Sequence, residues 1–200
     1  MIAGPAELTL IQLTIYTDAQ VVQGTVRTRA RRLVDVFDPA GGPFLVVEEV
    51  TMDEHGSRGR PTITPFAQIR LEAILFAYTD AAFADEADPA PAHPAVLLAV
   101  PPFIVAGTVD ALPGQKDFRD AVADLPGGFV RVAAASFWSD PLNEGRRRTP
   151  FIAVNGARVE VAAPHRDVDP WAGLDVARAA HPAIVDEAGG GVELGQAEES

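Results

Sequence analysis

The stretch TPFIAVNGARVEV, Thr149–Val161, decides how the chain is organised, because TPFAQIRLEAILF at Thr64–Phe76 echoes it 85 residues earlier. The same offset of 85 aligns three more pairs of residues: Gly42 with Gly127, Phe44 with Phe129, and Asp35 with Asp120. Gly-Thr-Val at 24–26 returns at 107–109, an offset of 83, so two residues are inserted between these points. Similarity at a fixed spacing is typical of a duplicated structural unit. The sequence therefore predicts two copies of one small module.

The composition is that of a folded, acidic protein. Hydrophobic residues make up 48% of the 200 residues, which is enough for packed cores and excludes wholesale disorder. Cysteine is absent, so disulfides, thiolate metal sites and cysteine nucleophiles are excluded. The formal net charge is −12, which disfavours a phosphate-binding surface and makes nucleic acid the less favoured partner.

The sequence shows no targeting or membrane signal. No basic segment followed by an apolar one opens the chain, and no run approaches the roughly 18 apolar residues of a membrane-spanning helix. We therefore expect a cytoplasmic protein of bacterial type with no membrane partner.

Side-chain alternation with a period of two predicts strands in both copies. These strands are expected at 8–16, 21–26, 44–52, 66–78, 129–138 and 151–162. Gly24 lies inside the second strand and predicts a bulge or a sharp bend there. Pro65 and Pro150 are expected at the first residue of a strand, where a sheet tolerates proline.

Short helices and loops are expected between these strands. Apolar residues at helical spacing predict a short helix at 27–37, with a counterpart around 117–125 in the second copy. The polar, glycine-containing segments 53–61 and 139–148 are expected to be exposed hairpin loops.

The expected fold class is mainly β, with two tandem small β-barrel modules, each carrying a short helix between its second and third strands. The expected domains are a first barrel at 1–80, a proline-rich acidic linker at 81–94, a second barrel at 95–164, and a short helix with an acidic disordered tail at 165–200.

This order of elements resembles the Sm-like and SH3-like small barrels. Residues 151–159 are similar to the second Sm motif: Gly156 and Val159 match it, and Asn155 stands where that family carries its RNA-stacking arginine. In the first copy Arg70 occupies that position, but Leu71 replaces the glycine. The aspartate and asparagine of the first Sm motif are absent from both copies, and Sm proteins carry their helix at the N-terminus. The chain also resembles bacterial proteins with a Gly-Thr-Val strand and an Arg-Leu-x-Asp turn, here 32–35, a likeness that implies no activity.

The sequence contains no residue pattern that indicates a catalytic site. The four histidines have no ligand spacing and are expected on the surface: His55, His93, His165 and His181. Glu48 and Glu49 are neighbours on a predicted strand, so they point to opposite faces and cannot share a site. No serine has a nucleophile-elbow context. We therefore expect a non-enzymatic protein without a metal or a cofactor.

Arginine clusters are the candidate binding residues, because guanidinium groups grip phosphates and carboxylates. Together with Asn155, the candidates are Arg29, Arg31, Arg32, Arg58, Arg60, Arg146, Arg147 and Arg148. The competing interpretation pairs these arginines with the acidic groups of the protein itself. Three functions remain open. The first is an interaction or scaffold protein that self-associates or binds a protein partner. The second is Sm-like RNA binding through the arginine loops, and the third is ligand sensing between the modules.

Overall fold

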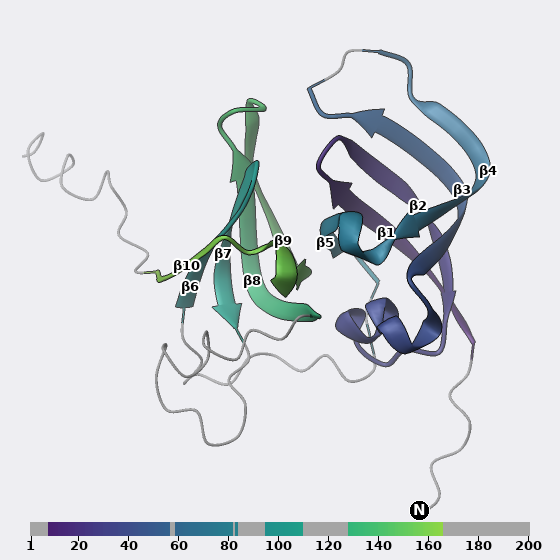
Figure 1. The fold of residues 1–200 in the computed structure, drawn as a ribbon, viewed down its shortest axis with the longest axis horizontal. Coiled ribbons are helices and arrows are strands. Elements are labelled where there is room, and N and C mark those ends of the chain that lie inside the picture. The colour runs from purple at the N-terminus through teal and green to yellow at the C-terminus, as the bar shows by residue number, and fades with distance from the viewer. Residues whose placement is uncertain (1–7, 57–58, 82, 84–94, 110–127, 166–200) are drawn as a thin grey trace, which may run out of the picture. The chain divides into compact units, whose positions relative to one another are not determined.

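The computed structural model of the chain describes residues 8–56, 59–81, 83, 95–109 and 128–165, within one compact unit, Met1–Arg166. The expected mainly β class is confirmed, since the described strands form one open antiparallel sheet (Figure 1). The strands are β1 Thr9–Thr17, β2 Gln20–Thr28, β3 Phe44–Glu54, β4 Thr62–Arg70, β5 Ile74–Tyr78, β6 Ala95–Val100, β7 Phe103–Val109, β8 Phe129–Ser139, β9 Glu144–Asn155 and β10 Val161–Pro164. Short 3₁₀ helices are η1 Leu33–Phe37, η2 Pro39–Gly41, η3 Leu71–Ala73 and η4 Gly156–Arg158.

The strand order repeats once across the sheet. The full order is β10-β6-β7-β8-β9-β5-β1-β2-β3-β4. Strands β1–β5, called the first half below, follow the order β5-β1-β2-β3-β4, and strands β6–β10, the second half, follow β10-β6-β7-β8-β9. The two halves are joined where β5 pairs with β9.

The pairing registers of the halves also correspond. Tyr16 pairs with Phe76 across β1 and β5, and Ala99 pairs with Val161 across β6 and β10. These partners are related by the offsets of 83 and 85 that the sequence shows. The residue pairs at the two ends of the β3–β4 ladder also have counterparts, 85 residues later, in the ladder between β8 and β9.

Glycine in β2 and in β7 allows a close approach of neighbouring strands. A Cβ on Gly24 would lie 2.6 Å from a methyl carbon of Val47, and one on Gly107 would lie 2.6 Å from a methyl carbon of Val132. Real Cβ atoms do not approach other atoms so closely, so only glycine fits. The strand registers shift at both glycines, which confirms the bulge predicted at Gly24.

The two Thr-Pro-Phe prolines do not open their strands, contrary to expectation. Pro65 lies inside β4 and Pro150 inside β9, because these strands begin earlier, at Thr62 and Glu144. The residues opposite the prolines in register, Glu49 and Ala134, have φ of 52° and 47°. This local distortion places the prolines where a regular hydrogen-bonded ladder is already interrupted.

The segment between β2 and β3 is helical over a short stretch that begins later than predicted. Strand β2 runs on to Thr28, and two 3₁₀ turns follow: η1, in which Leu33 and Phe37 are buried, and η2. Two apolar anchors four residues apart suffice to dock one turn, and Pro39 ends it. The predicted helix around 117–125, most of the 81–94 linker and nearly all of the 165–200 tail lie outside the described residues.

Two clusters of buried side chains form the core, and β5 contributes to both. Ile74 and Ala77 pack with residues of β1–β4 and η1, whereas Leu75 and Phe76 pack with residues of β6–β9. All four side chains are fully buried. Burial stabilises each large one by about 2 kcal/mol, so this five-residue strand supports both halves.

Candidate interaction surface

The edge of the sheet at β4 is unpaired and apolar. Among the described residues β4 pairs with β3 alone. Ile63 and Phe66 on β4 are 77% and 59% exposed, and Phe44 and Val46 on β3 are 43% and 50% exposed. We call these four residues and the outer backbone of β4 the β4 edge. An unpaired strand that carries exposed apolar side chains is a template for pairing with another chain.

The opposite edge is formed by β10. This four-residue strand pairs with β6 alone within the described part of the chain. Val161 at its start is 55% exposed, and Pro164 ends it. Proline removes a backbone donor, so the pairing capacity of β10 is confined to its first three residues.

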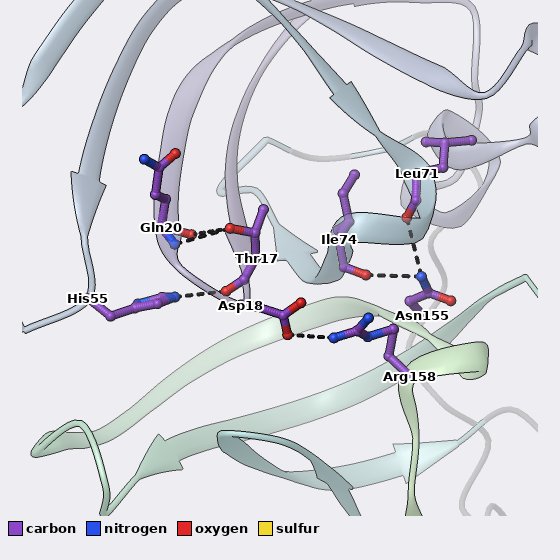
Figure 2. A network of polar contacts seen from close by, with 8 residues as sticks. All are labelled: Thr17, Asp18, Gln20, His55, Leu71, Ile74, Asn155 and Arg158. Atoms are coloured by element: carbon purple, nitrogen blue, oxygen red, sulfur yellow. Dashed lines mark hydrogen bonds and ion pairs between the residues drawn. The ribbon is translucent and has the colours of Figure 1, made fainter.

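Asn155 holds the junction between the two halves. Only two residue pairs join β5 to β9, Phe76 with Val154 and Ala77 with Ala153. The side-chain amide of Asn155 extends this short ladder by donating hydrogen bonds to the carbonyls of Ile74 (2.9 Å) and Leu71 (3.2 Å) (Figure 2).

The second heteroatom of the Asn155 side chain is also engaged. Its Oδ1 accepts a 3.1 Å hydrogen bond from the backbone N–H of Ala157 and so caps η4. Asn155 is 4% exposed. The structure therefore places this predicted binding residue inside the junction and not on a surface.

A surface ion pair also crosses the junction. The guanidinium of Arg158 on η4 lies 2.5 Å from Oδ1 of Asp18, in the turn between β1 and β2 (Figure 2). Asp18 is 58% exposed, so solvent screens this pair, and its contribution is about 0–1 kcal/mol. Next to it, the ring of His55 donates from Nε2 to the carbonyl of Thr17 at 2.8 Å.

An aromatic cluster surrounds Tyr16, a residue that sequence reasoning did not single out. Its buried ring stacks on Phe76 with centroids 4.6 Å apart and meets the edges of Phe103 and Phe137 at 5.2 and 5.3 Å. His55 stacks on the same ring at 5.9 Å and is half-buried, so the surface position expected for this histidine is wrong. Aromatic residues on distant strands give no joint signal in a sequence, because only the fold brings them together.

The hydroxyl of Tyr16 faces a charged pair. It donates a long hydrogen bond, 3.5 Å, to Oε1 of Glu144, and the guanidinium of Arg147 lies 3.5 Å from the same oxygen. Burial, and then the charge of Glu144, raise the pKa of Tyr16. Oε2 of Glu144 and Nδ1 of His55 are buried without a hydrogen-bond partner among the described residues. This cluster contains no activated nucleophile, and its plain consequence is a tyrosine held in its neutral form.

The arginines after β2 and β3 are exposed at separate places. Arg29, Arg31 and Arg32 follow the end of β2, and Arg32 forms a bidentate pair with Asp35 at 2.7 and 3.1 Å. Arg60 is exposed just before β4, and Arg58 lies outside the described residues.

The segment 139–148 is not the loop that the sequence predicts, because β9 begins at Glu144. Arg146, Arg147 and Arg148 are therefore consecutive strand residues, and neighbours on a strand point to opposite faces. The guanidinium of Arg146 lies 4.3 Å from the centre of the Trp138 ring, whereas Arg147 faces Glu144. The structure does not gather this triplet into one basic patch.

Open clefts also lie among the described residues. One of about 450 Å³ is lined by Gln12, Thr14, Gln23, Tyr78, Thr79, Asp80 and Ala81. Another, of about 410 Å³, is lined by Asp18, Pro101, Ala157, Arg158 and Glu160. Both linings are polar and shallow, unlike the enclosed apolar pockets that hold most small ligands.

Comparison with protein-family models, with curated proteins and with solved structures gave no match to this chain. Within the described residues no helix is both long enough and apolar enough to cross a membrane. In the same residues no group of three or more His, Asp or Glu side chains is placed to hold a metal ion.

Proposed function

We propose that this protein is a non-enzymatic interaction or scaffold protein, built from two fused small β-barrel modules, which binds an extended polypeptide strand at the β4 edge. The observation that carries this proposal is the β4 edge, where β4 has no strand partner on its outer side among the described residues and four apolar side chains of β3 and β4 are exposed. The proposal places this activity in the cytoplasm, with proteins as partners.

The second half supports the proposal by contrast. Strand β9 occupies the place of β4 in its own half, and there β5 pairs with it. Its phenylalanine corresponding to Phe66 is Phe151, which is half-buried beneath the guanidinium of Arg131 at 4.3 Å. Phe66, which has no such cover, is 59% exposed.

The expected binding energy comes from two sources. Covering Phe66 and Ile63 would contribute about 1.5–3 kcal/mol for each side chain that becomes fully buried. Backbone hydrogen bonds along β4 would fix the partner in an extended conformation, as in other strand-addition complexes. Gln68 and Arg70 frame the apolar residues with polar groups, which is the composition of a transient interface.

A peptide display experiment tests this function. Immobilised protein is used to select binders from a library of extended peptides, and binding is mapped by backbone hydrogen exchange. We expect selected peptides to protect residues 62–70 and to lose binding to Phe66→Lys but not to Leu10→Lys, an equally exposed residue on an inner strand. Binders that protect other segments, or a library that yields none, would contradict the proposal.

The alternative function is Sm-like RNA binding through arginine side chains. Its support is the exposure of Arg60, Arg146 and Arg148, and the arginine–tryptophan stack at Trp138. Its test is a salt titration with single-stranded RNA, comparing wild type with a variant in which Arg146 and Arg148 are both alanine. Affinity that falls steeply with salt and is lost in the variant would favour it over strand binding.

A further inference from the structure

The junction between the halves shows what fits the β4 edge. It is a contact between two different surfaces, the outer edge of β9 and the outer edge of β5. At the offset of 85, β9 corresponds to β4, and β5 corresponds to the segment that contains β10. Each of these counterparts is an edge strand that pairs on one side only within the described residues. As far as the described residues go, one chain thus carries counterparts of both surfaces of its internal junction without a strand paired on them.

We propose that a second copy of this chain docks its β10 on β4 of the first, head to tail, and repeats between chains the pairing of β5 with β9. This inference rests on the proposed function, because it names the strand that the β4 edge receives. Contacts between two different surfaces propagate from copy to copy, closing into a ring or continuing as a filament.

The register of the new contact follows from the junction. The pairs Phe76 with Val154 and Ala77 with Ala153 become Val161 with Ile69 and Ala162 with Gln68. Of the four residues in this register, Val161 and Gln68 are exposed, Ala162 is half-buried and Ile69 is buried. The outer backbone of both strands has no strand partner among the described residues, so it is the backbone of these strands that the new pairing would use. The pairing uses the end of β4 beyond Pro65, just as β5 uses the end of β9 beyond Pro150. The missing N–H of proline therefore does not obstruct it.

The side chains around this register agree with it. Phe129, at the start of β8, is covered by Phe37 of the first half, with ring centroids 4.3 Å apart. Its counterpart Phe44 is 43% exposed and lies at the corresponding place beside β4. At the β4 edge this ring meets the guanidinium of Arg70 at 5.6 Å and keeps an exposed face, which a second copy would cover.

Arg70 stands where Asn155 stands in the other half, since each pairs with the corresponding phenylalanine, Phe44 or Phe129. Asn155 donates to the carbonyls of Leu71 and Ile74, whose counterparts in the second half are Gly156 and Val159. The guanidinium of Arg70 has five donors on a longer side chain. Within one chain this guanidinium pairs with the carboxylate of Glu72 and lies 5.6 Å from the centre of the Phe44 ring. Its remaining N–H donors are the ones that we expect to serve the repeated junction with the second copy.

Light scattering after size exclusion, over a range of protein concentrations, measures the assembly. We expect a mass that is a multiple of one chain, either constant as in a closed ring or rising with concentration as in a filament. A mass equal to one chain at every concentration, up to several hundred micromolar, would overturn the inference.

Two blocked variants then separate head-to-tail pairing from other contacts. Phe44→Glu places a charge beside β4, and Val161→Glu places one on β10, each at an exposed position that the fold tolerates. Each variant alone should be monomeric, and an equal mixture should form a complex of only two chains, joined by the one intact β4 and the one intact β10. Leu10→Glu, a similarly exposed residue on an inner strand, is the matched control and should assemble like wild type. A Val161→Glu variant that still assembles, as in β4-to-β4 pairing, would refute the proposal.

The same experiments distinguish this inference from the proposed function. A monomeric wild type that binds displayed peptides at residues 62–70 refutes self-pairing and leaves strand binding intact. A monomeric wild type that binds no displayed peptide at those residues refutes both.

Discussion

The edges β4 and β9 occupy the same place in the two halves, yet one is open and the other is covered. Both strands contain Thr-Pro-Phe, and both lie beside a strand that begins with phenylalanine, β3 or β8. Beyond the proline, β9 continues with Ala153, Val154 and Asn155, which are buried against β5. Strand β4 continues with Gln68 and Arg70 exposed on either side of Ile69. The comparison shows that β4 and β9 keep the same strand arrangement, and that a few residues after the proline determine whether the edge is buried by another strand or exposed.

The largest effect is expected from a substitution at the glycine that both halves carry at corresponding positions. Gly107→Ala would place a Cβ 2.6 Å from a methyl of Val132 and 2.7 Å from the carbonyl oxygen of Ala133, and backbone cannot move away cheaply. We expect a loss of about 3 kcal/mol or more in the free energy of unfolding, measured by denaturant titration. Gly24→Ala should lose a similar amount, because its new Cβ would lie equally close to a valine methyl, of Val47, and to a carbonyl oxygen, of Glu48.

Gly145→Ala is the matched control for these glycines, since it lies in a strand with no atom within 4 Å of the new Cβ. It should change stability by less than about 1 kcal/mol. Equal losses at Gly145 and at Gly107 would show that the close strand approach is not what requires glycine.

Asn155→Ala tests the covered edge. It leaves the carbonyls of Leu71 and Ile74 without their side-chain donor and removes the cap of η4. We expect a loss of about 2–3 kcal/mol in the free energy of unfolding. Arg70→Ala at the open edge, measured at a concentration that keeps the chain monomeric, should change it by no more than about 0.5 kcal/mol. Equal effects would mean that the two positions do not differ as the structure indicates.

The alkaline stability of the protein tests the aromatic cluster at the junction. The pKa of Tyr16 is raised above its ordinary value of 10.0, so above pH 10 the unfolded chain releases a proton that the folded chain retains. The contribution of this hydroxyl is therefore complete below pH 10 and is lost as pH rises, by about 1.4 kcal/mol per pH unit. Tyr16→Phe should flatten the decline in unfolding free energy that the wild type shows between pH 10 and 11. A Tyr16→Phe profile that declines as steeply as that of the wild type would contradict this assignment.

The smallest effect is expected at the surface pair across the junction. Asp18→Ala removes the partner of Arg158, an exposed interaction that contributes about 0–1 kcal/mol. The difference from wild type should vanish in about 1 M salt, where the screening length falls to about 3 Å. A salt-independent loss would indicate that Asp18 acts through packing and not through charge.

Local patterns in the sequence predict much of this fold. Alternation identifies β1, β2, β3 and β8, and the bulge at Gly24 follows from a glycine inside a strand pattern. These features depend on residues close together in the chain, where periodicity and glycine chemistry act directly. The repeat spacing of 85 residues is also informative, because residues that repeat at this spacing occupy corresponding positions in the strand registers of the two halves.

Features that depend on distant contacts could not be predicted in this way. The charged run Arg146–Arg148 is typical of a loop, and it lies in β9 because β8 supplies a partner strand. The sequence predicts Asn155 to be a surface residue, but it is buried because β5 of the first half pairs with β9. The open β4 edge is likewise defined by which strand does not reach it, a property that no local pattern encodes.

The double role of β5 governs what happens when the chain is cut. A break in the connection between Tyr78 and Ala95 keeps both sequence copies whole, yet the fragment from residue 95 onward lacks Leu75 and Phe76, which close its core. That fragment also exposes the buried edge of β9 along with its amide, Asn155. The second half therefore lacks part of its own interior, and we expect the two halves to unfold together and not one after the other.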